Sequence, residues 1–412
     1  MKRLIHLTLL AAGLLLAFGW PQTTQIRLYV IGDSTASPYD GSTYPRKGWA
    51  QVFQDFFDQD SVFVLNRARS GRSSKSYYHE GAGWPAVKTQ LQAGDFLFIQ
   101  FGHNDSKPDT SRFTDPFTTY QEYLGRYVNE ARAMGVTPVL LTSIHRNAWQ
   151  ADTLQIEDTH GDYLVAMREL ADSMNVALID MANLTDSLYE ALGYAYTTEQ
   201  IFLNLPAGLY PAYPTGNEDN THLSETGAYE LAKLVADELA VMSDSSVQPL
   251  QSGLYDMVKV PFAVTPAGAG YIQGPRYFAE GLEESLFARP VDGYSFQQWT
   301  VDGQTVETST RHSFALSEGD TTVRLAEFGL ASGLDPHPMP GLKVLASDTA
   351  LRLQSETPIH ALRLIDQAGR SLYHWAETAT PELVVPMDGY PAGVYYLRIE
   401  RSEDQGWYKV KR

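Results

Sequence analysis

Ile26-Arg27-Leu28-Tyr29-Val30-Ile31-Gly32-Asp33-Ser34-Thr35 is the stretch that decides the fold. Its apolar run ends on a small turn, which is typical of a buried strand of an α/β sheet. Such a turn presents the hydroxyl of Ser34 at the carboxyl edge of the sheet, where open α/β folds place their ligand crevices. We therefore expect a functional group at this turn.

Short apolar runs and amphipathic segments alternate from this stretch to about residue 242, the end of the first domain (residues 25–242). Further strands are expected at Val62–Leu65, Phe96–Gln100, Pro138–Thr142 and Val176–Asp180. Helices are expected at Trp49–Asp58, Tyr120–Met134, Gly161–Asn175 and from Glu225 onward. Strands that alternate with helices predict an α/β fold with a mostly parallel sheet, covered by helices on both faces.

The pattern changes after residue 242. A polar linker is expected at residues 243–246, and short strands with Gly, Pro and Asp punctuation predict a small all-β module at residues 258–328. Glycines and prolines in residues 329–341 indicate a second linker. Strand patterns return in residues 342–412 and predict a second small all-β domain.

The N-terminus has the pattern of a secretory signal peptide over residues 1–19. Lys2 and Arg3 precede the apolar run Leu4 to Ala17, and Ala17-Phe18-Gly19 is a plausible cleavage site. An uncleaved N-terminal anchor is the alternative. No later stretch is apolar and long enough to span a bilayer.

Composition narrows the class of function. The formal net charge of -18 argues against binding to nucleic acid or to anionic membrane surfaces. The chain has no cysteine, which excludes disulfides, a thiol nucleophile and any cysteine-ligated metal.

Four short blocks carry groups suited to acyl transfer. Ser34 supplies a hydroxyl nucleophile, which needs a base to remove its proton. His222 is the best candidate for that base, because Asp219 lies three residues before it and can bond the ring Nδ1. The backbone amides of Ser34 and Gly71 and the side-chain amide of Asn104 can donate to the oxyanion. Each of the first three blocks follows a predicted strand, so they should gather at one sheet edge.

Each block also has a plainer interpretation. Gly-Asp-Ser is a common turn, and Asp219 and His222 alone could be a helix cap and a surface histidine. His145 also follows a predicted strand and competes with His222 as the base, although no carboxylate lies close to it in the sequence. A metal site is disfavoured because no His-x-x-x-His or carboxylate cluster has ligand spacing. All four blocks together favour the catalytic interpretation.

These blocks resemble the SGNH (GDSL-type) hydrolase superfamily, and more closely its rhamnogalacturonan acetylesterases. The matching stretches are Gly32-Asp33-Ser34-Thr35-Ala36, Asn66 to Tyr77, Gly102-His103-Asn104-Asp105 and Asp219-Asn220-Thr221-His222-Leu223. The resemblance covers about Gln25 to Met242 and implies a flavodoxin-like three-layer domain. It also implies removal of acetyl groups from a pectin-type polysaccharide through an acetyl-enzyme on Ser34, without a cofactor.

Basic and aromatic residues crowd the second of these blocks. We hypothesise that Arg72, Lys75 and two neighbouring arginines form a basic rim that meets the galacturonate carboxylates of the polymer. Pairing of these side chains with the protein's own acids is the alternative. Tyr77 is a candidate for stacking on a sugar ring, although a buried aromatic is the commoner outcome.

The C-terminal segment, residues 342–412, resembles the sorting domain of the type IX secretion system of Bacteroidetes. The matching features are Leu362 to Arg370, Leu383-Val384-Val385-Pro386, Ala392 to Arg398 and the basic end Lys409 to Arg412. The resemblance implies the secretion machinery as a partner, a secreted or cell-surface location, and removal of the tail. An ordinary β-sandwich accessory domain is the alternative. The middle module resembles bacterial repeat modules with a Gly-Tyr-x-Phe-x-x-Trp core, here Gly293 to Trp299, and is either a spacer or a carbohydrate-binding module.

Two rival functions fit parts of the sequence. One is another SGNH esterase, acting on acetylated xylan or on lipid or thioester substrates. The absence of large apolar lid segments disfavours lipid. The other is a non-catalytic surface protein that binds carbohydrate, which the presence of both Ser34 and His222 disfavours.

Overall fold

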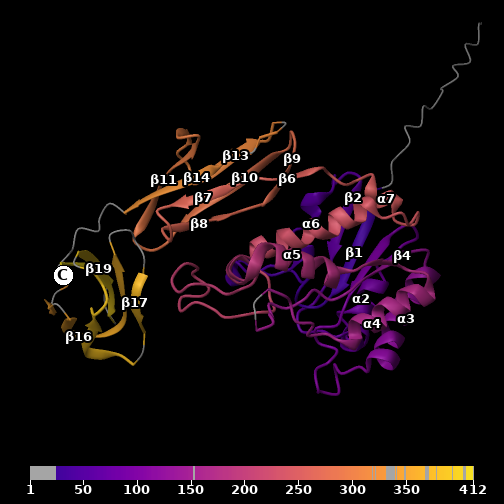
Figure 1. The fold of residues 1–412 in the computed structure, drawn as a ribbon, viewed down its shortest axis with the longest axis horizontal. Coiled ribbons are helices and arrows are strands. Elements are labelled where there is room, and N and C mark those ends of the chain that lie inside the picture. The colour runs from indigo at the N-terminus through magenta and orange to yellow at the C-terminus, as the bar shows by residue number, and fades with distance from the viewer. Residues whose placement is uncertain are drawn as a thin grey trace, which may run out of the picture.

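The computed structural model describes residues 25–151, 154–317, 319–320, 322–330, 339, 341–347, 349–366, 371–376, 378–391, 393–401 and 405–411. The expected signal peptide lies outside the described residues, as does most of the second expected linker. Figure 1 shows an α/β domain, a β module and a group of C-terminal strands that follow one another along the long axis of the molecule.

Five parallel strands form the sheet of the α/β domain, in the order β2-β1-β3-β4-β5. They are β1 (Ile26–Gly32), β2 (Val62–Asn66), β3 (Phe96–Gln100), β4 (Thr137–Leu141) and β5 (Ala177–Ile179). The predicted strands are therefore confirmed, each to within two residues at either end. The strand order reverses between β1 and β3, which is where open parallel sheets bind their ligands.

Alternate residues of the strands pack against two different layers of helices (Figure 1). Leu28 and Val30 of β1 join a core with α5 (Met181–Tyr196) and α6 (Glu225–Val241). Tyr29 and Ile31 join a second core on the opposite face. The helices of that second layer are α1 (Ser74–His79), α2 (Trp84–Lys88), α3 (Gln121–Ala133) and α4 (Asp162–Met174). The two cores confirm the expected three-layer arrangement.

The helices predicted around α3, α4 and α6 are confirmed. The prediction of a helix at Trp49–Asp58 is wrong. The segment forms two short 3-10 turns, η2 (Trp49–Gln51) and η3 (Phe53–Phe56). The Gln54 side chain bonds Val62 O (3.1 Å) and Val64 N (2.7 Å), and so occupies the open edge of β2. The apolar spacing predicts an α-helix, but contacts with distant residues fix the segment in a different form.

Two sheets and one small ribbon make up the β module. Its strands are β6 (Met257–Lys259), β7 (Phe262–Thr265), β8 (Gly270–Gln273), β9 (Tyr277–Ala279), β10 (Glu283–Pro290), β11 (Tyr294–Val301), β12 (Gln304–Glu307), β13 (Arg311–Ala315) and β14 (Arg324–Leu330). The sheet orders are β13-β10-β8 and β12-β11-β14-β7, and β6 pairs with β9. Trp299 from the Gly-Tyr-x-Phe-x-x-Trp motif is fully buried in the module's core.

The core of the α/β domain extends past the boundary expected at residue 242. Leu250 of α7 (Gln248–Gln251) and Tyr277 of β9 belong to the same core as α6. The Tyr277 hydroxyl donates to Glu230 Oε2 on α6 at 2.7 Å, and Lys259 Nζ lies 2.5 Å from Glu230 Oε1. The α/β domain and the β module therefore share a packed interface.

The C-terminal strands are β15 (Leu342–Ala346), β16 (Ala350–Asp366), β17 (Ser371–Trp375), β18 (Thr380–Pro386), β19 (Val394–Arg401) and β20 (Gln405–Lys411). The first part of β16 pairs with β15 and β18, and its last part pairs with β17 and β19. The register shifts between these parts, so a single long strand serves two sets of neighbours. The turn expected at residues 366–369 lies largely outside the described residues.

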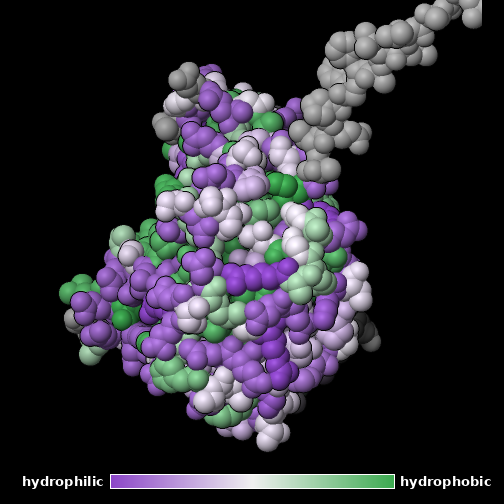
Figure 2. Space-filling view, turned by 90° about the vertical axis from the view of Figure 1, so that its right-hand side faces the viewer, coloured by the Kyte–Doolittle hydropathy of each residue, from purple (hydrophilic) through white to green (hydrophobic). Residues whose placement is uncertain are grey.

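No helix in the described ranges combines the length and the hydropathy needed to cross a bilayer. Figure 2 shows one face of the molecule as mainly hydrophilic, with hydrophobic residues scattered in small groups.

The shared interface predicts that Tyr277→Ala destabilises the α/β domain. The variant loses a buried ring and leaves Glu230 without one donor, so we expect the free energy of unfolding to fall by about 3 kcal/mol. Thermal melting followed by the far-UV circular dichroism of the helices measures this. Tyr294→Ala, which removes a ring from the module's own core, is the matched control and should shift the helix signal less. Identical helix melting in wild type and Tyr277→Ala would contradict a shared core.

Candidate active site

Ser34 lies directly after β1, in the tight turn that the sequence predicts. The buried Asp33 accepts hydrogen bonds through Oδ1 from Thr35 N (2.9 Å) and Thr35 Oγ1 (2.8 Å), which closes the turn. Gly32 passes so close to β3 that a Cβ atom there would lie 2.7 Å from Gln100 O. Only glycine allows this approach, and the position of Ser34 is set by it.

A buried carboxylate joins the loops that carry Gly71 and Asn104. Asp105 accepts hydrogen bonds from Ser74 N (3.1 Å) and Ser74 Oγ (2.5 Å), and Asn104 Nδ2 donates to Arg72 O at 3.1 Å. Gly71 has a φ of +79°, a left-handed backbone that favours glycine, and open space on the side where a Cβ would be. The two predicted oxyanion donors after β2 and β3 are therefore brought together.

His222 and Asp219 form the contact that the sequence predicts. His222 Nδ1 lies 2.6 Å from Asp219 Oδ2, while Asp219 Oδ1 accepts from the backbone amides of Thr221 (2.9 Å) and His222 (3.0 Å). Burial raises the pKa of Asp219, but these hydrogen bonds outweigh it and lower the pKa to about 2. Asp219 is thus ionised at neutral pH and fixes the orientation of the imidazole.

Backbone hydrogen bonds join the Ser34 turn to the His222 loop. Trp49 N donates to Thr35 O at 3.0 Å, and Lys47 N donates to Leu223 O at 3.1 Å. Burial raises the pKa of Asp33, although hydrogen bonds from Thr35 and the charge of His222 lower it. Ser34, Gly71, Asn104, Asp219 and His222 therefore share the carboxyl edge of the sheet.

Arg146 and Asn147, in the loop after β4, hold the His222 loop from the other side. Arg146 Nη1 donates to Thr221 Oγ1 at 2.5 Å, and Asn147 Nδ2 donates to Asn220 Oδ1 at 2.8 Å. Neither residue is among those predicted from the sequence. Their place directly after a predicted strand, like that of the first three blocks, was the signal that could have found them.

His145 and His103 lie buried beside His160. The His103 and His160 rings are 4.4 Å apart, and His145 lies 6.3 Å from His160. Burial lowers the pKa of His103 and of His145, so both rings are neutral. Within the described residues no carboxylate is hydrogen-bonded to His145, whereas His222 has Asp219. This difference favours His222 as the base.

The structure places the three predicted substrate-binding residues against other parts of the protein. Tyr77 is fully buried and donates its hydroxyl to Arg67 O at 2.7 Å, so the prediction that it stacks on a sugar ring is wrong. Arg72 forms a bidentate ion pair with Glu80, in which Nε donates to Oε2 and Nη2 to Oε1, both at 2.8 Å. This is the internal pairing that the alternative predicts. Lys75 Nζ donates to Thr110 O at 2.7 Å.

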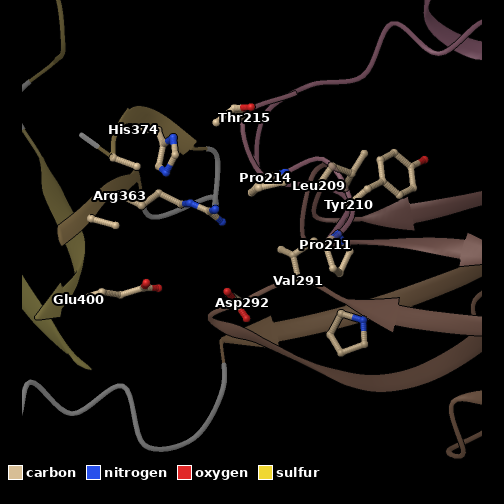
Figure 3. A pocket seen from close by; sticks show the side chains of 14 residues that line it. Leu209, Tyr210, Pro211, Pro214, Thr215, Val291, Asp292, Arg363, His374 and Glu400 are labelled. Atoms are coloured by element: carbon tan, nitrogen blue, oxygen red, sulfur yellow. The ribbon is translucent and has the colours of Figure 1, made fainter. Parts of the chain in front are cut away.

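Two cavities lie near the loop of residues 203–217. One, of about 830 Å³, is lined in part by Asn204, Asn217 and Asn220, and so borders the His222 loop. The other, of about 440 Å³, lies between this loop, the β module and the C-terminal strands; Figure 3 shows Arg363 and Asp292 facing it. Neither cavity is lined by Ser34 or His222. In the ranges that the structure describes, no three His, Asp or Glu side chains are grouped to hold a metal ion.

Comparison with known families gives two matches. Residues 30–228 match the GDSL-like Lipase/Acylhydrolase family, and residues 260–331 match the Divergent InlB B-repeat domain. The first match contains all the residues of the site described above. The second coincides with the β module.

Three of the curated relatives that match each align with about half of the chain. Rhamnogalacturonan acetylesterase RhgT of Bacillus subtilis is 41% identical over 212 residues, which are 52% of this chain and 88% of the relative. The probable rhamnogalacturonan acetylesterase YesY of the same organism is 35% identical over 51% of this chain and 90% of its own. A rhamnogalacturonan acetylesterase of Emericella nidulans is 28% identical over 52% of this chain and 84% of its own.

The buried carboxylate between the two donor loops predicts a pH-dependent stability. Burial raises the pKa of Asp105 from 3.8 to about 7, although hydrogen bonds from Ser74 and Thr114 lower it. The folded state therefore binds more protons than the unfolded chain between these values, and the stability from this group falls as pH rises from about 4 to about 7.

We expect Asp105→Asn to remove the part of the pH dependence of stability that Asp105 causes, because the amide does not titrate. Urea unfolding of wild type and variant at several pH values measures the effect. The wild type should lose stability relative to the variant as pH rises. Parallel stability curves for the two proteins would contradict the assignment.

Proposed function

Because the chain belongs to the GDSL-like Lipase/Acylhydrolase family, it is a carboxylic ester hydrolase, and we propose that it deacetylates rhamnogalacturonan, a pectin-type polysaccharide. The main structural support for catalysis by Ser34 is the 2.6 Å contact between His222 Nδ1 and Asp219 Oδ2, which lies at the same edge of the sheet as Ser34. The names of the relatives support the substrate.

The proposed reaction begins with Ser34. Its Oγ attacks the acetyl carbonyl carbon while the Nε2 of His222 accepts the hydroxyl proton. Asp219, ionised and bonded to Nδ1, stabilises the imidazolium that forms. The negative charge on the carbonyl oxygen is met by the backbone amides of Ser34 and Gly71 and by Asn104 Nδ2.

The intermediate then collapses to an acetyl-enzyme. The C–O bond to the sugar breaks, and the imidazolium returns its proton to the sugar oxygen. Water then attacks the acetyl carbonyl carbon while His222 accepts its proton. The bond between this carbon and Ser34 Oγ breaks, and the imidazolium returns the proton to Ser34 Oγ, which releases acetate. Apart from the hydrolytic water, the proposed steps use only the side chains and backbone of this chain.

We also propose that the protein is exported and acts outside the cell. The support is the pattern of residues 1–19 and the likeness of residues 342–412 to a sorting domain. A substrate that is a large polymer fits an extracellular location.

The proposed mechanism predicts that Ser34→Ala lowers kcat for acetate release by about 10⁴-fold or more. Purified wild type and variant should be compared on acetylated rhamnogalacturonan, acetylated xylan and an aryl acetate. Ser42→Ala, on a neighbouring exposed loop, is the matched control and should keep its activity. Rapid quenching of wild type should yield a Ser34 peptide heavier by one acetyl group.

The outcomes separate the proposals. Ser34-dependent release from xylan and the aryl acetate alone would keep the mechanism and reject the pectin substrate. Release that does not depend on Ser34 would reject the mechanism itself.

The export proposal predicts that the mature protein lacks residues 1–19 and part or all of residues 342–412. Intact-mass measurement of the protein recovered from the medium or the cell surface tests it. A full-length chain found only inside the cells would contradict it.

A further inference from the structure

Arg46 lies between the Ser34 turn and the His222 loop. The residues that follow it are bonded to both, since Lys47 N donates to Leu223 O (3.1 Å) and Trp49 N donates to Thr35 O (3.0 Å). The segment is held by the edge of the sheet on one side and by the loop before α6 on the other. Arg46 is therefore fixed close to the groups that carry the proposed reaction.

The guanidinium of Arg46 rests on the ring of Tyr39. Its Cζ lies 4.3 Å from the ring centroid, and the Tyr39 hydroxyl donates to Ser34 O at 2.8 Å. Burial raises the pKa of Tyr213, while the charge of Arg46 lowers it and that of Asp219 raises it. The guanidinium of Arg46 is therefore linked through Tyr39 to the backbone of Ser34.

Arg46 has no anionic partner in the described part of the chain. Its Nε is buried without an acceptor, and no carboxylate forms an ion pair with it. By contrast, Arg27 and Arg168 are each held by an aspartate and Arg72 by a glutamate. A buried donor left unsatisfied is costly, and an unpaired arginine is unexpected in a chain with a net charge of -18.

We infer that Arg46 binds the carboxylate of an acidic sugar beside the acetylated position of the substrate. The inference rests on the proposed function and adds the residue that selects an acidic polymer. The planar guanidinium can donate two parallel hydrogen bonds to a carboxylate. The ring of Tyr39, on which the guanidinium stacks, restricts its orientation. Binding there gives the guanidinium of Arg46 the anionic partner that it lacks in the described part of the chain.

Arg46 fits this task better than the basic rim expected from the sequence. The guanidinium of Arg72 already forms an ion pair with Glu80, and Lys75 Nζ donates a hydrogen bond to Thr110 O. A carboxylate bound at Arg72 would have to displace an internal ion pair, whereas one bound at Arg46 displaces none.

The test compares two substrates that differ in the state of their carboxyl groups, which are ionised in one and methyl-esterified in the other. These are an acetylated rhamnogalacturonan oligosaccharide and the same oligosaccharide with its carboxyl groups converted to methyl esters. We expect wild type to prefer the acidic form, and Arg46→Gln to lower the ratio of kcat/KM values, acidic over esterified, by about tenfold or more, mainly through KM. Arg46→Lys keeps the positive charge but cannot donate two parallel hydrogen bonds, so its ratio should lie between those of wild type and Arg46→Gln.

Two control proteins accompany this test. Arg126→Gln removes one positive charge from an exposed ion pair with Glu122 on α3, and should leave the ratio unchanged. The double variant Arg72→Gln/Lys75→Gln tests the rival rim. Ser34-dependent hydrolysis of an aryl acetate by Arg46→Gln shows that the site is formed, and Arg46→Lys serves if the glutamine variant does not fold.

Four results would overturn the inference. An equal loss on both oligosaccharides would mean that Arg46 only supports the structure. A change of the ratio in the double variant and not in Arg46→Gln would assign the carboxylate to the rim. Wild type that deacetylates both forms equally would retain the proposed function and reject the role of Arg46, whereas wild type active on the aryl acetate alone would reject the pectin substrate and the inference with it.

Discussion

Hydrogen bonds between buried side chains of different loops hold the carboxyl edge of the sheet together. Asp105 joins the loops after β2 and β3 through Ser74. Gln100, at the end of β3, accepts from Trp49 Nε1 (2.8 Å) and donates to Thr142 O after β4 (3.2 Å). Because each of these groups would be costly to leave unpaired, the loops have little freedom to separate. The proposed oxyanion donors and Ser34 are therefore held in place before a substrate arrives, which the proposed electrostatic catalysis requires.

Features that depend on local pattern could be predicted from the sequence. The strands of the α/β domain follow from short apolar runs, and a parallel sheet necessarily brings their carboxyl ends to one edge. The contact between Asp219 and His222 follows from a spacing of three residues within one loop. In each case the residues that decide the structure are close together in the chain, so no knowledge of distant contacts is needed.

Features that depend on distant contacts could not be predicted. Trp49–Asp58 has helical spacing, but the Gln54 side chain takes the place of a strand beside β2. Tyr77 is fully buried in the core, although its neighbours in the sequence are polar. Arg46 stands out only because no acid pairs with it in the described part of the chain, which is a property of the whole fold. The core of the α/β domain extends beyond residue 242, because Tyr277, far along the chain, is part of it.

That shared core has a consequence for how the chain folds as it is made. Synthesis runs from the N-terminus, so the five parallel strands and α6 emerge from the ribosome before β9 exists. The apolar surface of α6 that Tyr277 covers is exposed during this interval, when nascent chains are most open to aggregation and to capture by chaperones. Domain-by-domain folding during translation, the usual course for long chains, is thus incomplete here until the first part of the β module has been added.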